Sequence, residues 1–136
     1  MEKKIGIWLD YQKAFLVSME GKKVMTRIDS KVENYHLFGG AKASTPYSAQ
    51  DVASEKKLRE RRKHQIQDYF NAIVQLIKGA DQIYIFGPAE AKIGLDKHIR
   101  NIHEFRNLRL VVESASHLTE NQMTARVREF FEKEKV

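Results

Sequence analysis

The chain has 136 residues, 42% of them hydrophobic and 31% charged, which is the composition of a single folded domain. It has no cysteine, so cysteine chemistry is excluded, and no apolar run approaches a signal h-region or a membrane span, so we expect a cytoplasmic protein without a membrane partner. Lysine and arginine outnumber aspartate and glutamate by 24 to 18, and the net charge of +6 favours a nucleic acid or ribosome over an acidic protein as partner.

Three short strands are predicted at the start of the chain. Residues 4–10 read as a buried strand, residues 13–20 as a second strand, and residues 22–30 as a half-exposed strand with alternating polar and apolar side chains. Gly21 lies between the second and third strands and supplies the permissive backbone of a tight turn. The three strands therefore form an antiparallel meander.

A long segment without periodicity follows, at about residues 31–54, and it contains the pair Gly39 and Gly40. Loops of this length in compact domains are usually functional or disordered. We predict a mobile loop. Its glycine pair is either a plain solvent-exposed turn or a tip whose missing side chains allow close approach to a partner.

One long helix is predicted from about Ser54 to Lys78, with Gly79 as its end. Its second half is amphipathic, with apolar side chains at helical spacing between Ile66 and Ile77. Its first half is almost entirely charged, so we expect it to project beyond the core.

The rest of the chain alternates strands and helices. Residues 82–86 read as a buried strand of the parallel type, and residues 108–112 read as the last strand. Thr119 begins a capping box that starts a last helix with Met123, Val127, Phe130 and Phe131 inward. The segment from Gly87 to Glu90 opens the intervening helix, with Pro88 in its first turn. The predicted fold is one α/β domain over residues 1–136, with a mixed sheet in which the meander is followed by α-β-α-β-α.

The charged half of the long helix is the strongest candidate for a binding site. Such basic runs bind phosphates, because each contact releases counterions. The alternative is a solvated helix end without a ligand. The candidate RNA-binding residues of this run are Lys56, Lys57, Arg59, Arg61, Arg62, Lys63 and His64.

Four acidic residues lie at the predicted strand ends: Asp10, Asp81, Glu90 and Glu113. A two-metal nuclease needs several carboxylates that converge on its ions, and the sequence leaves open whether these four do so. The usual role of acids at strand ends is to close turns. The histidines show no metal-ligand spacing, so we predict neither a metal site nor a cofactor.

Three motifs, in the same order, resemble the middle domain of eukaryotic and archaeal class-I peptide chain release factors and of Pelota. That family carries a loop similar to His-Gly-Arg-Gly-Gly-Gln, and this chain has His36, Gly39 and Gly40 followed by Ala41 and Lys42. The segment Lys57–His64 resembles the family's arginine-rich helix, and Gly87–Leu95 resembles its next turn and helix. The chain looks most like the free-standing bacterial relatives of that domain.

This resemblance implies a ribonuclease H-like fold and a role in translation. In the family, the Gly-Gly-Gln tip reaches the peptidyl transferase centre and helps water attack the peptidyl-tRNA ester. Ala41 stands in place of the glutamine, and a methyl group neither donates nor accepts a hydrogen bond, so we do not expect peptide release by this chain. The implied partners are the ribosome, through its large subunit, or tRNA, as for Pelota-type rescue factors.

Two other functions are compatible with the sequence. The chain can be an interaction module for a protein partner or for itself, forming a homo-oligomer without RNA. It can also be a metal-dependent ribonuclease H-like hydrolase. Salt-sensitive RNA binding would favour the role in translation over the interaction module. Metal-dependent activity would identify the hydrolase.

Overall fold

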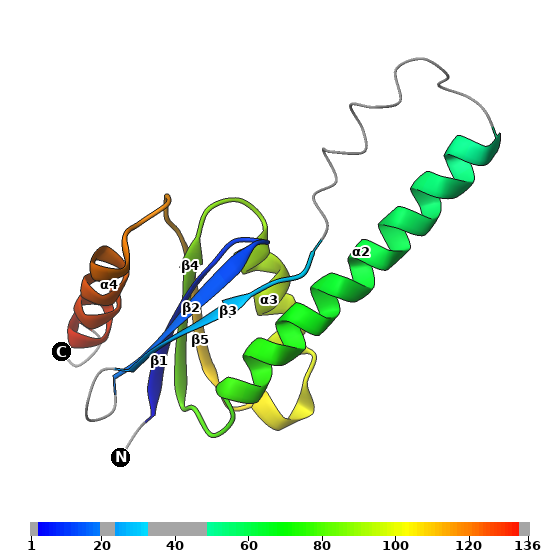
Figure 1. Ribbon diagram of the computed structural model, residues 1–136. Helices are drawn as coiled ribbons and strands as arrows, with labels where there is room; N and C mark the ends of the chain where they lie inside the picture. Colours follow the sequence, from blue (N-terminus) through cyan, green and yellow to red (C-terminus); the bar gives the residue numbers. More distant parts are fainter. Residues whose placement is uncertain (1–2, 20–23, 33–48, 134–136) are drawn as a thin grey trace.

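A five-stranded mixed sheet of order β3-β2-β1-β4-β5 forms the centre of the computed structural model, which describes residues 3–19, 24–32 and 49–133 (Figure 1). β1 pairs antiparallel with β2, and β2 with β3, whereas β1, β4 and β5 run parallel. The predicted meander and the parallel strands beside it are thereby confirmed. The strands are β1 (Lys4–Leu9), β2 (Lys13–Ser18), β3 (Val24–Asp29), β4 (Gln82–Gly87) and β5 (Arg109–Ser114).

Helices cover both faces of this sheet. On one face lie α2 (Ala49–Leu76) and α3 (Ala91–Arg100), and on the other lies α4 (Glu120–Lys133); the short η2 (His103–Phe105) precedes β5. The parallel strands need crossover connections, which α2 and α3 supply. The predicted α/β class, with a mixed sheet and a meander followed by α-β-α-β-α, agrees with this arrangement.

The side chains of β1 explain the two-sided packing. Successive residues of a strand point to opposite faces. Ile5, Ile7 and Leu9 join the cluster under α2 and α3, whereas Trp8 joins the cluster under α4. Both faces are thus apolar, which is why this strand reads as a continuous hydrophobic run.

The last helix sits very close to β1. A Cβ atom added to Gly6 would lie 2.2 Å from Cγ2 of Val127, so only glycine leaves room for α4 at this point. The predicted capping box starts α4: the Gln122 amide donates to the Thr119 hydroxyl at 3.2 Å, and the Thr119 amide donates to the Gln122 side chain at 2.9 Å.

Two predicted helix starts are wrong. α2 begins at Ala49 rather than Ser54, so the end of the predicted loop is helical. α3 begins at Ala91, after Glu90 as N-cap, so Pro88 precedes the first helical turn instead of lying within it. Ala89 takes the left-handed conformation there, with φ 53°, and this kink turns the chain from β4 into α3. Residues 33–48, the centre of the predicted loop, and the Gly21 turn lie outside the described residues.

Candidate nucleic-acid interface

The two halves of α2 have different surroundings, as the charge pattern predicts. Its second half packs on the sheet through Tyr69, Phe70, Ile73 and Ile77. Its first half extends past the end of the sheet at which β1 and β4 finish (Figure 1). Leu58 in this first half is buried but belongs to neither hydrophobic cluster.

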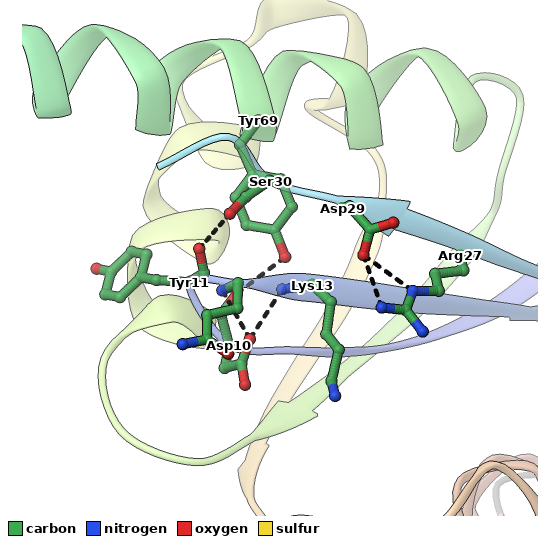
Figure 2. Close-up of polar contacts among 8 residues, drawn as sticks. Asp10, Tyr11, Lys13, Arg27, Asp29, Ser30 and Tyr69 are labelled. Atoms are coloured by element: carbon green, nitrogen blue, oxygen red, sulfur yellow. Dashed lines mark hydrogen bonds and ion pairs between the residues drawn. The ribbon is translucent and has the colours of Figure 1, made fainter. Parts of the chain in front are cut away.

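Hydrogen bonds fix α2 where it leaves the sheet. The Tyr69 hydroxyl donates to the backbone carbonyl of Asp10 at 2.9 Å, and the Ser30 hydroxyl donates to the carbonyl of Tyr11 (Figure 2). Burial and the nearby Asp10 raise the pKa of Tyr69, so its hydroxyl stays protonated and remains a donor. The turn between β1 and β2 is therefore attached to both α2 and the end of β3.

The β1–β2 turn also supports one residue of the basic run. The guanidinium of Arg62 lies over the Tyr11 ring, 5.3 Å from its centroid. Burial raises the pKa of Tyr11 and Arg62 opposes the rise, so the ring carries an uncharged hydroxyl beside the cation. Arg62 is accordingly half-buried and oriented, whereas the other basic side chains of the run are exposed.

The structure divides the predicted basic residues between two sides of α2. Residues three and four apart share a helix face, and residues two apart do not. Arg59, Arg62 and Lys63 line a groove toward α3. Lys57 and Arg61 lie about 200° around the helix from Arg59 and point away from it. The sequence placed these cations in one run, and the fold separates them into two surfaces.

The groove between α2 and α3 brings in residues that sequence reasoning did not assign to a binding site. It has a volume of about 420 Å³ and is lined by Arg59, Arg62, Lys63, Ile66, Gln67, Phe70, Gly94 and His98. The α2 members follow one another at helical spacing, which is a signal present in the sequence. Nothing in the sequence indicated that α3 would supply the opposite wall.

His98 is held in a defined orientation on that wall. Its Nε2 lies 2.8 Å from the Asn71 side-chain oxygen, and its ring packs against Phe70 with centroids 5.6 Å apart. Burial lowers the pKa of His98, so the imidazole is uncharged at neutral pH. The groove therefore combines a cationic side with a neutral ring that can stack or hydrogen-bond.

The predicted site also includes residues of the loop. His36, Gly39, Gly40 and Lys42, together with Ala41, lie outside the described residues. Lys56 and His64 are described, and both are exposed on the charged half of α2.

The four acids at the strand ends do not gather at one place. Asp10 closes the β1–β2 turn by accepting the amides of Gln12 and Lys13 at 2.7 and 2.9 Å, and Asp81 accepts the Lys3 amide at the opposite end of the sheet. Glu113 accepts the Tyr84 hydroxyl on the α4 face, and Glu90 occupies the N-cap position of α3 without a capping hydrogen bond from its side chain. Within the described ranges, no group of three or more histidine, aspartate or glutamate side chains is placed to hold a metal ion.

Comparisons with known proteins find distant likenesses among solved structures. No family model and no curated protein matches the chain. Among solved structures it is similar to the archaeal translation termination factor aRF1, with 14% identity and a TM-score of 0.43 over 98% of this chain and 40% of that one. It is also similar to Archaeoglobus fulgidus Pelota, with 12% identity and a TM-score of 0.42 over 98% of this chain and 36% of that one.

Both of these proteins are more than twice as long as the part that the chain spans. Separately, none of the helices in the described part of the chain is both long enough and apolar enough to cross a bilayer.

Proposed function

We propose that the chain binds RNA of the translation apparatus through the charged half of α2, acting in the cytoplasm on the ribosome's large subunit or on tRNA. The observation that carries this proposal is the projection of that half beyond the sheet, with its cations on a rigid helix. A helix anchored at Tyr69 holds the backbone of these residues in place, so only their side chains have to become ordered when phosphates bind.

The motifs that resemble the release-factor middle domain are the reason to propose the ribosome rather than RNA in general. Ala41 makes ester hydrolysis by the family's glutamine unavailable, so the proposed role is binding, as in rescue, hibernation or a termination-related step. The arrangement of Asp10, Asp81, Glu90 and Glu113 gives no support to the nuclease alternative.

Ribosome co-sedimentation tests the proposal. Wild type should migrate with ribosomes at low salt and leave them at moderate salt, because phosphate contacts release counterions. Arg61→Glu plus Arg62→Glu should abolish migration, since it reverses one cation on each side of α2.

The matched control is Arg128→Glu plus Lys133→Glu, which makes the same change in net charge on the exposed face of α4. It should leave co-sedimentation unchanged apart from a small general effect. Equal loss in both variants, or no co-sedimentation of wild type under any condition, would refute binding through α2. Self-association of wild type that survives salt would then favour the homo-oligomer reading.

A further inference from the structure

The groove between α2 and α3 has the volume of a small-ligand site. Its volume of about 420 Å³ falls within the range of about 300–1,000 Å³ for such sites. Phosphate binding alone needs only exposed cations on a convex helix. A concave site beside those cations therefore suggests recognition of something more than a phosphate.

The two walls of the groove have complementary chemistry. On the α2 side, Arg59, Arg62 and Lys63 supply positive charge, and Gln67 supplies an amide that both donates and accepts. On the α3 side, His98 supplies a planar ring. A nucleotide offers a phosphate, a hydrogen-bonding base edge and a flat base face, and each of these three has a suitable group here.

The geometry of the α3 wall is set by packing. Gly94 lies against Phe70, where an added Cβ would be 3.1 Å from the ring atom Cζ, so α3 approaches α2 closely at this point. Phe70 itself is buried and backs the His98 ring. The side-chain oxygen of Asn71 contacts the imidazole at Nε2. His98 is therefore oriented before any ligand arrives.

We propose that this groove binds one unpaired nucleotide of single-stranded RNA, with consecutive phosphates of the strand at Arg59, Arg62 and Lys63 and the base beside His98 and Gln67. The inference rests on the proposed function and adds a preference to it. Bases in a duplex are stacked and paired, so a duplex can offer its phosphates to α2 but no base to the groove.

The test measures fluorescence anisotropy of two labelled RNAs of equal length, a ten-nucleotide oligouridine and a hairpin without a free single strand. Wild type should bind the single strand at least about tenfold more tightly than the hairpin, given the usual strength of base–aromatic stacking. Gln67→Glu and His98→Asn should each remove most of this preference while leaving hairpin binding within about threefold.

The matched control is Gln75→Glu, which places the same new charge on an exposed glutamine of α2 outside the groove. It should keep the wild-type preference. Thermal unfolding of each variant checks the fold, and Gln67 is exposed, so its substitution should not unfold the domain.

The outcomes separate the two proposals. If wild type binds neither RNA, binding by α2 fails and the groove inference fails with it. If wild type binds both RNAs equally and the groove variants keep that ratio, the groove inference alone is overturned. If uridine 5′-monophosphate binds as tightly as the oligouridine, the site takes a free nucleotide, and the assignment to single-stranded RNA is overturned.

Discussion

The division of cations between two sides of α2 predicts a difference that a salt titration measures. Arg59→Gln with Lys63→Gln removes two cations from the groove side. Lys57→Gln with Arg61→Gln removes the same residue types from the side that points away. The two variants have the same composition and the same net charge, so only the position of the lost charge differs between them.

The magnitude follows from the number of cations at the groove. A single strand that contacts Arg59, Arg62 and Lys63 gives a slope of about −2 in a plot of log affinity against log salt, at about −0.7 per phosphate contact. Raising salt from about 50 to about 200 mM then weakens wild-type binding about 20-fold. The groove-side variant retains one contact, so the same change in salt weakens its binding only about threefold.

Fluorescence anisotropy with the oligouridine at four or more salt concentrations gives both slopes. The variant of Lys57 and Arg61 should keep the wild-type slope and lose only a small part of the affinity at low salt. Equal reductions of the slope in the two variants would show that RNA contacts α2 on all sides, and the reasoning from helix faces would then be wrong.

Three other predictions concern the parts of the fold that support the site. Gly6→Ala should lower the free energy of unfolding by about 1–3 kcal/mol, because its Cβ would overlap Val127. In a Val127→Ala background the same change should cost less than half as much, as urea unfolding of the double-mutant cycle will measure. Tyr69→Phe should lower the free energy of unfolding by about 1–3 kcal/mol at an unchanged m-value, because the Asp10 carbonyl loses its donor. An unchanged free energy of unfolding would show that this hydrogen bond does not stabilise the fold. Burial lowers the pKa of His98 below 6.5 in the folded protein. As the pH falls, the His98 imidazole is therefore protonated in the unfolded chain before it is protonated in the folded one. The free energy of unfolding should therefore fall as pH drops below 6.5 toward the lower folded-state pKa, and His98→Asn should flatten that part of the profile.

The sequence predicts the strands and helices because their burial is regular. β1 and β4 are apolar on both faces, and the second half of α2 repeats its apolar residues at helical spacing. The start of α2 is missed because the apolar residues of 49–53 do not continue the helical spacing that marks the second half of α2. The place of Pro88 is missed because the turn at Ala89 depends on a left-handed residue that is not glycine.

The candidate site is predicted only in part, for a different reason. The basic run is visible in the sequence, but its division between two surfaces needs the helix to be docked on the sheet. His98 and Gly94 lie about thirty positions after the run and join it only because α3 packs beside α2. Such a site comes from tertiary contacts, and no local pattern records it.

A single helix therefore serves the core and the candidate interface, and the β1–β2 turn links the two. Tyr69 attaches α2 to the carbonyl of Asp10, and the ring of the next residue, Tyr11, supports Arg62 at the groove. A change that loosens this turn should reduce both stability and nucleotide preference. A change confined to the exposed far side of α2 should alter neither the fold nor the groove. Tyr69→Phe therefore predicts a weaker preference for single strands even though Tyr69 does not line the groove, and an unchanged preference in a measurably destabilised variant would show that the groove is held by α3 alone.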